Sequence, residues 1–159
     1  MLKILVIQTA SIGDVILATP VVEKLHLFFP DARIDLLVKK GNESLFTDHP
    51  FLHEVMVWDK KMHKWQSFGK LIHHVRHEKY DFVVNLQRFF MTGLLTAFSG
   101  AETKIGFDKN PLSFLYTKRI SHKLGEGIHE INRNLSLIVE ITGNSETLPR
   151  LYPSTTDFS

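Results

Sequence analysis

The turn from residue 8 to residue 14 holds the side chains with the clearest chemical potential. Its sequence is Gln-Thr-Ala-Ser-Ile-Gly-Asp, and it stands between an apolar run and a helical pattern. Gly13 permits close backbone approach or a positive φ angle, and the Ser11 hydroxyl is a candidate helix cap. Asp14 has a purely structural alternative, as a first-turn acid that the helix dipole favours. Because ligands of open α/β sheets sit beyond the carboxyl ends of the strands, this turn is a candidate binding site.

Several kinds of chemistry are excluded by the residue types that are present. Only Gly13 stands where a dinucleotide fingerprint needs three glycines, and there is no P-loop lysine, which argues against a tightly bound dinucleotide and a Walker-type NTPase. The chain has no cysteine, so disulfides, thiolate zinc sites and cysteine nucleophiles are excluded. His73 and His77 are four residues apart on a predicted helix, but no third ligand is evident nearby, and we interpret them as solvent-facing.

Alternating strands and helices must position this turn. Strands are predicted at residues 2–7, 34–38, 54–58, 81–86 and 104–107, helices at 15–29, 41–49, 65–77, 89–98 and 129–142, and an irregular segment at 108–128. This alternation predicts right-handed βαβ units and therefore an α/β fold, a Rossmann-like open parallel sheet with helices on both faces. We expect one domain over residues 1–143 and a linker over residues 144–159.

Basic residues gather between residues 53 and 79. The formal net charge of the chain is only +2, but this segment holds six Lys and Arg and five His against three acids. It is either a solvated helix face or a surface for an anionic partner. Trp65 and Phe68 within it either touch a membrane interface or belong to the core. The N-terminus does not resemble a signal peptide, and no apolar stretch approaches the ~18 residues that span a bilayer, so we expect a cytoplasmic protein.

Five sequence landmarks occur in the order in which a known enzyme family has them. They are Ser11-Ile-Gly-Asp-Val15 with Pro20 shortly after it, residues 29–38, residues 80–87, Lys104-Ile-Gly-Phe107 and His129-Glu-Ile-Asn132. Together they resemble glycosyltransferase family 9, the ADP-heptose:lipopolysaccharide heptosyltransferases. The resemblance covers essentially all of residues 1–150.

This resemblance implies the N-terminal half of a GT-B glycosyltransferase, whose two Rossmann-like domains face each other across a cleft. The N-terminal domain would receive the acceptor, which is the lipopolysaccharide inner core, and the C-terminal domain would bind the donor ADP-heptose. The reaction would invert the anomeric centre without a metal or a cofactor. By resemblance, Asp14 is the general base that accepts the proton of the attacking hydroxyl. The residues expected to contact the acceptor are Ser11, Ile12, Gly13, Lys39, Gln87, Arg88, Lys104 and His129.

The chain departs from the family in its length. A family member is roughly twice as long, and its nucleotide site lies beyond the linker at which this chain stops, so we expect that this chain alone does not transfer sugar. A second hypothesis stays open, in which the chain is a stand-alone, non-catalytic Rossmann-like module that binds an anionic lipid, a glycan or a partner protein. We expect no nucleic-acid partner. A lipid-borne acceptor would allow peripheral contact with the cytoplasmic face of the inner membrane.

Overall fold

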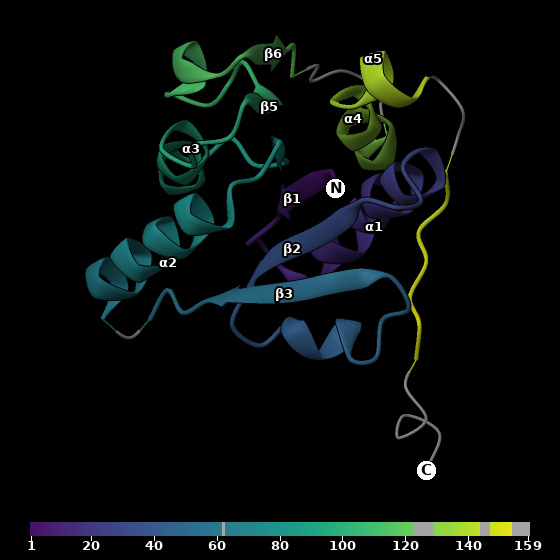
Figure 1. The fold of residues 1–159 in the computed structure, drawn as a ribbon, viewed down its shortest axis with the longest axis horizontal. Helices are drawn as coiled ribbons and strands as arrows, with labels where there is room; N and C mark the ends of the chain where they lie inside the picture. Colours follow the sequence, from purple (N-terminus) through teal and green to yellow (C-terminus); the bar gives the residue numbers. More distant parts are fainter. Residues whose placement is uncertain (62, 123–128, 144–146, 154–159) are drawn as a thin grey trace.

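The fold is an open parallel sheet with helices on both faces, as Figure 1 shows for the computed structural model, which describes residues 1–61, 63–122, 129–143 and 147–153. The strand order is β3-β2-β1-β4-β5-β6, and each neighbouring pair is parallel. The strands are β1 (Lys3–Ile7), β2 (Arg33–Lys39), β3 (Leu52–Trp58), β4 (Phe82–Asn85), β5 (Thr103–Phe107) and β6 (Lys118–Ile120). The helices are α1 (Ile12–Phe28), α2 (Lys64–Glu78), α3 (Phe90–Ala97), α4 (Glu130–Ser136) and α5 (Val139–Thr142), with short 3-10 helices η1 (Glu43–Phe46) and η2 (Ser113–Leu115).

The core lies on both faces of the central strand β1. Side chains alternate along a strand, so Ile4 and Val6 join one buried cluster while Leu5 and Ile7 join the other. The first cluster packs against α1 and α4, and the second packs against α2 and α3. A strand covered on both faces must be apolar throughout, which explains the continuous apolar run at the start of the chain. The predicted α/β fold is confirmed.

Three elements differ from the sequence-based expectation. The helix expected over 41–49 is only the four-residue 3-10 helix η1. The segment 108–128, expected to be irregular, contains β6, which is only three residues long and partly polar and therefore leaves no strand pattern in the sequence. The helix expected over 129–142 is divided into α4 and α5, because the backbone N–H groups of residues 137 and 138 bond three residues back rather than four. Gly125 and Gly127 lie outside the described residues.

Pro20 lies in the interior of α1 without ending the helix. A proline has no N–H group, so the carbonyl four residues earlier, that of Ile16, loses its helical donor. The Thr19 hydroxyl donates a hydrogen bond of 2.7 Å to this same Ile16 oxygen. Thr19 and Pro20 are both buried. A side-chain hydroxyl therefore replaces the backbone donor that the proline removes.

Residues 147–153, within the predicted linker, lie along α1. The backbone N–H of Arg150 donates to the Thr19 hydroxyl over 3.1 Å, and the Tyr152 hydroxyl donates to Glu23 over 2.7 Å. Figure 1 shows this segment as the yellow trace that descends beside α1 and the start of β3. The described part of the linker is thus held by the domain, while the position of the domain boundary stays a prediction.

His49 makes the stability of this region depend on pH. Its ring packs edge-on against Tyr152, with centroids 4.6 Å apart, and its Nδ1 accepts from the N–H groups of Phe51 and Leu52. Burial, and after it the nearby charge of His26, lowers the pKa of His49 to about 4. The unfolded chain therefore binds a proton as pH falls through the ordinary histidine value of 6.5, while the folded chain does not until about pH 4.

We expect the free energy of unfolding to fall by about 1–2 kcal/mol between pH 7 and pH 5 because of this residue, with allowance for solvent screening. His49→Asn keeps a side-chain acceptor for the two N–H groups but cannot titrate. Urea denaturation at both pH values measures the effect as the difference between the two proteins. An equal loss of stability in both would show that His49 is not its source.

Candidate functional site at the carboxyl edge of the sheet

The loop between β1 and α1 lies where the order of the sheet changes direction. From β1 the chain proceeds to β2 on one side, and the later strand β4 pairs with β1 on the other side. Such a switch point leaves a crevice at the carboxyl ends of the strands, which is where α/β proteins bind ligands. Two pockets flank the loop, and Ala10 lines both.

The first, which we call the switch-point pocket, lies on the β4 side and has a volume of about 450 Å³. It is lined by Gln8, Ala10, Asp14, Leu17, Leu86, Gln87, Arg88, Phe89, His122, Glu130 and Arg133. These residues come from four separate parts of the chain: the β1–α1 loop with α1, the end of β4, the end of β6 and α4. Only the folded sheet brings them together.

Asp14 lies in the wall of this pocket at the third position of α1. Ser11 caps the helix: its hydroxyl donates to Asp14 Oδ2 over 2.7 Å, and its Oγ accepts from the Asp14 backbone N–H over 3.4 Å. Asp14 is half-buried. The structural role that the sequence left open is therefore present, and it holds the carboxylate in one orientation at the edge of the pocket.

Gln87 is buried and holds the β1–α1 loop in place. Its Oε1 accepts two hydrogen bonds from Thr9, one from the backbone N–H at 3.0 Å and one from the hydroxyl at 2.6 Å. Its own backbone N–H donates to Asn85 Oδ1 over 2.9 Å. The side-chain oxygen of Gln87 is thus engaged within the protein, and the arrangement ties the end of β4 to the loop that carries Asp14.

Cationic and titratable side chains face Asp14 across the pocket. Arg88 is exposed and, within the described ranges, forms no ion pair, whereas Arg133 is paired with Glu130. Burial, and after it the charges of Arg133 and Arg88, lowers the pKa of His122, which stays neutral at pH 7. In the part of the chain that the structure describes, His122 Nδ1 has no hydrogen-bond partner. An anionic or hydroxyl-bearing ligand would find partners here.

The second, the lysine pocket, lies on the β2 and β3 side of the loop and has a volume of about 550 Å³. It is lined by Thr9, Ala10, Ser11, Lys39, Lys40, Gly41, Trp58, Asp59, Lys60 and Lys61. The Lys60 ammonium donates to the Thr9 carbonyl over 2.6 Å and lies 5.3 Å from the centre of the Trp58 ring. Burial, and after it the charges of Lys39 and Lys64, lowers the pKa of Lys60. Trp58 is buried, and its Nε1 donor has no partner among the described residues.

The family to which the chain belongs follows from comparison with known proteins. Residues 68–154 match the family described as glycosyltransferase family 9 (heptosyltransferase). The chain belongs to glycosyltransferase family 9. Among family members, lipopolysaccharide heptosyltransferase 3 from Escherichia coli is 30% identical over 135 residues, which are 81% of this chain and 40% of that protein.

Solved structures of glycosyltransferase family 9 proteins share the fold. The E. coli ADP-heptose lps heptosyltransferase II matches with a TM-score of 0.77 and 22% identity over 98% of this chain and 48% of that one. A glycosyl transferase family 9 protein from Veillonella parvula matches with a TM-score of 0.79 and 21% identity, over 97% of this chain and 46% of that one. The chain therefore spans about two fifths of its curated relative and about half of these structures.

The site residues that the family resemblance predicted do not all line one pocket. Ser11 is the N-cap of α1, and Ile12 and Gly13 are its first two residues; all three are exposed and precede Asp14. Lys39 lines the lysine pocket, and Gln87 and Arg88 line the switch-point pocket. His129 is the N-cap of α4, where its Nδ1 accepts from the Ile131 N–H over 3.3 Å, and it stands beside the pocket residue Glu130 without lining the pocket.

Lys104 is a correction to the predicted site. It lies near the start of β5, at the amino edge of the sheet, and its ammonium donates to the Ala97 carbonyl over 2.8 Å. The opposite edge holds both pockets, so we leave Lys104 out of the proposed acceptor site. The sequence reasoning missed His122, Glu130 and Arg133 instead. For Glu130 and Arg133, the sequence did hold a signal, because an acid and a base stand three residues apart at the start of the predicted helix 129–142.

Two further expectations concerned α2. Of the two alternatives for these aromatics, Phe68 takes the core one, since it is only 4% exposed, whereas Trp65 is 71% exposed. His73 and His77 are both exposed, as interpreted from the sequence. No helix in the described ranges is long and apolar enough to cross a bilayer.

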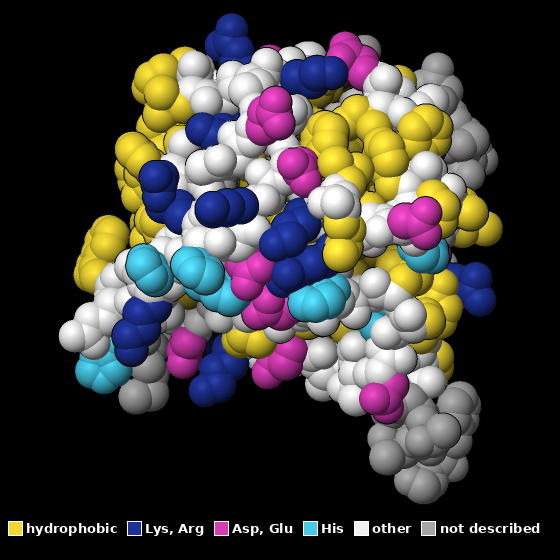
Figure 2. All heavy atoms as spheres, in the orientation of Figure 1, with side chains coloured by type: hydrophobic (Ala, Val, Ile, Leu, Met, Phe, Trp, Pro, Cys, Tyr) yellow, Lys and Arg dark blue, Asp and Glu magenta, His cyan; other side chains and the backbone are white. Residues whose placement is uncertain are grey.

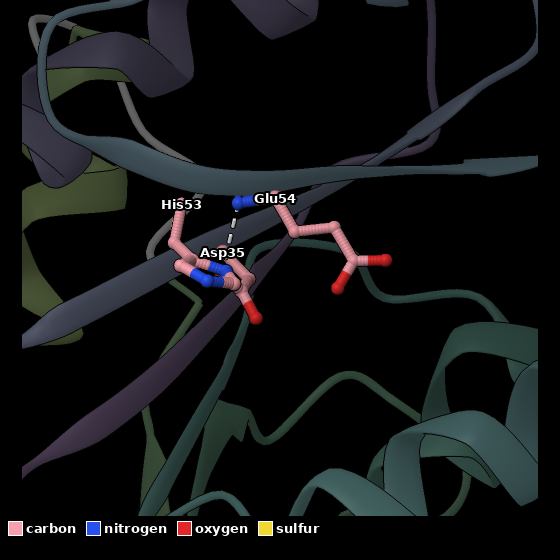
Figure 3. Close-up of side chains that lie close together, drawn as sticks. All are labelled: Asp35, His53 and Glu54. Carbon is pink, nitrogen blue, oxygen red and sulfur yellow. Dashed lines mark hydrogen bonds and ion pairs between the residues drawn. The ribbon is translucent and has the colours of Figure 1, made fainter.

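A separate cluster of charged side chains lies at the amino edge of the sheet, between α2 and β3, where Figure 2 shows Lys and Arg, acids and His side by side. Two overlapping groups within it have metal-ligand types with atoms within 4.8 Å of one another: Asp35, His53 and Glu54, and Glu54, His74 and Glu78. Figure 3 shows the His53 ring beside the Asp35 carboxyl group. Arg33 nitrogens lie 3.0–3.5 Å from carboxylate oxygens of Asp35, Glu54 and Glu78, so all three acids already form ion pairs with a cation of the protein. We interpret the cluster as an internal ion network.

Proposed function

We propose that this chain is the acceptor-binding half of an inverting glycosyltransferase that transfers heptose from ADP-heptose to the inner core of lipopolysaccharide. Membership of glycosyltransferase family 9 supports the reaction class. The observation that carries the assignment of the half is the pair of pockets beside the β1–α1 loop, where Asp14 and Arg88 both line one pocket and four lysines line the other. An acceptor with phosphate and carboxylate groups and a reacting hydroxyl requires those two kinds of side chain.

Asp14 would accept the proton of the acceptor hydroxyl as that hydroxyl attacks the anomeric carbon and the nucleoside diphosphate leaves. A carboxylate in hydrogen-bond reach contributes about 10²–10⁴-fold to such a step. The bond from the Ser11 hydroxyl engages Asp14 Oδ2, which leaves Oδ1 for the substrate. The Ser11 hydrogen bond holds the carboxylate in one orientation, so the contribution proposed for Asp14 includes positioning of the reacting hydroxyl.

The anionic groups of the acceptor would bind to Arg88 and to the lysine pocket. Arg88 has no acidic partner within the described residues, so it can pair with a ligand without first breaking an ion pair. In the lysine pocket, Lys39 pairs with Trp58 in the register of β2 and β3, and Trp58 Nε1 has no partner among the described residues. The donor ADP-heptose would bind mainly to the part of the enzyme that this chain lacks, so we expect no sugar transfer by this chain alone.

The test is calorimetric titration of this chain with a deacylated inner-core acceptor and, separately, with an ADP-sugar. We expect acceptor binding and no detectable ADP-sugar binding. Arg88→Ala and Lys39→Ala should each lower acceptor affinity about tenfold, because each removes a charge-assisted hydrogen bond. Arg119→Ala, which changes an exposed arginine outside both pockets, should leave affinity within about twofold.

Tight ADP-sugar binding would place the nucleotide site in this domain and overturn the proposal. Acceptor binding that is indifferent to both pocket variants would instead place the acceptor elsewhere on the surface. Sugar transfer by the isolated chain would contradict the expectation that it is catalytically incomplete.

A further inference from the structure

An apolar stripe runs along the outer side of α3. Phe90, Met91, Leu94 and Phe98 fall within roughly a quarter to a third of the helix circumference. Met91 and Leu94 are partly buried and pack against the second core cluster, so Phe90 and Phe98 are the exposed members of the stripe. The opposite side of α3, with Thr92 and Leu95 among others, is buried against the sheet. Phe90 and Phe98 are each 50% exposed. A surface helix whose only role is to cover the core normally has polar side chains on its solvent side, whereas α3 has phenyl rings there.

The stripe is widened by the neighbouring 3-10 helix η2. Phe114 is 67% exposed and Leu115 is 42% exposed, and η2 contacts α3 directly. The segment just before η2 also lies close to α3, because Gly93 has no side chain: a Cβ there would lie 2.1 Å from Asn110 Oδ1. We call Phe89, Phe90, Phe98, Phe114 and Leu115 the aromatic patch. Figure 2 shows hydrophobic side chains along the left edge of the molecule, over α3 and η2.

Basic side chains stand at both ends of α3. Arg76 and Lys104 donate to the carbonyls of Phe98 and Ala97, over 2.9 and 2.8 Å, at the C-terminal end. Arg88 precedes the aromatic patch at the N-terminal end. Lys and Arg side chains also lie beside this hydrophobic edge in Figure 2. The patch is therefore apolar in its middle and positively charged at its ends.

We propose that the aromatic patch is a docking surface for an anionic phospholipid bilayer. Phenyl rings suit the boundary between head groups and acyl chains, and Lys and Arg beside them are attracted to anionic head groups. The alternative occupant is a further protein domain, which we would expect at the carboxyl edge of the sheet. The helix α3 runs from the carboxyl end of β4 to the amino end of β5, so its apolar stripe extends from one edge of the sheet toward the other and is not confined to the carboxyl edge.

Phe89 belongs to the patch and also lines the switch-point pocket, together with Arg88. Docking through the patch would therefore bring the mouth of that pocket to the lipid surface. This link rests on the proposed function, but the docking itself does not, because it can be measured without acceptor or donor.

The experiment is flotation of the full chain with vesicles of phosphatidylglycerol and phosphatidylethanolamine, and with vesicles of phosphatidylcholine alone. We expect binding to the anionic vesicles, weaker binding to the neutral ones, and a loss of about tenfold or more in partitioning for the double variant Phe98→Ser with Phe114→Ser. Phe28→Ser is the matched control, because Phe28 is 53% exposed on α1, on the other face of the sheet. It should change partitioning less than about twofold.

Circular dichroism and acceptor calorimetry on the same variants separate docking from folding and from the proposed function, because neither Phe98 nor Phe114 lines the switch-point pocket or the lysine pocket. Unchanged flotation of the double variant would overturn the proposal. So would a loss seen only in Trp65→Ser, which would assign the lipid contact to α2. Failure of acceptor binding with intact flotation would contradict the proposed function alone.

Discussion

Asp35→Ala should lower the free energy of unfolding by about 3–5 kcal/mol, because it removes the buried carboxylate from an ion network and leaves two donors, the Tyr80 hydroxyl and the Glu54 N–H, without their acceptor. The Asp35 side chain is fully buried, and an Arg33 nitrogen lies 3.0 Å from its Oδ2. The same carboxylate accepts from the Tyr80 hydroxyl over 2.5 Å and from the Glu54 backbone N–H over 3.1 Å. Burial, and after it the bond to Asp35, raises the pKa of Tyr80 far above its ordinary value, so the phenol remains a donor.

Urea denaturation at pH 7 measures this effect. A loss of this size is a large share of the 5–15 kcal/mol that is typical of a domain, so the variant is expected near its unfolding threshold at room temperature. Asp35→Asn keeps the shape and one acceptor oxygen and should lose less, while Tyr80→Phe removes a single hydrogen bond and should lose about 1–2 kcal/mol. If Asp35→Ala came within about 1 kcal/mol of the parent, the ion network would not be what holds β2, β3 and α2 together.

Gln87→Met should destabilise the fold by about 2–4 kcal/mol and also weaken acceptor binding. Methionine has nearly the same length but no strong acceptor, so the buried N–H and hydroxyl of Thr9 both lose the partner that they share. Each buried donor left unpaired costs about 1–3 kcal/mol. The loop that Gln87 fixes carries Asp14 and lines both pockets, so its displacement reaches the ligand as well as the fold.

Two comparison variants divide these contributions. Thr9→Val removes only the hydroxyl and should cost about 1 kcal/mol with little change in acceptor affinity. Gln87→Glu retains an acceptor oxygen at the same position and should keep more of the affinity than Gln87→Met does. Denaturant titration and calorimetry on all three proteins give both quantities. An affinity that is equal in Gln87→Met and the parent would mean that the loop is positioned without Gln87.

Much of the fold was predictable because its strands are apolar runs separated by helical patterns, and central parallel strands need side chains that are buried on both faces. The strand β6 could not be predicted in this way, since Lys118 and Arg119 occupy two of its three positions. The division of the last helix was equally hidden, because the apolar period continues through Leu137 and Ile138 while the hydrogen bonding changes.

The candidate site was predictable only where one local segment supplies it. The Ser11–Asp14 turn is continuous in sequence, and its capping geometry follows from residue types three apart. His122 and Arg133 line the pocket only because β6 ends at, and α4 lies at, the carboxyl edge of the sheet. This tertiary arrangement leaves no local pattern in the sequence. Lys104 was expected at the site because it lies on a strand. It stands near the amino end of that strand, however, and ligands of a parallel sheet bind at the carboxyl ends.

Thr19 connects two features that would otherwise be independent. Its hydroxyl donates to the Ile16 carbonyl that Pro20 leaves without a donor, and the same oxygen accepts from the N–H of Arg150. Loss of the proline would restore the backbone donor, and the hydroxyl would then be needed only by the segment around Arg150. Positions 19 and 20 should therefore covary among relatives: a hydroxyl residue should accompany the proline, and where the proline is lost the hydroxyl should persist only in chains whose later segment still crosses α1.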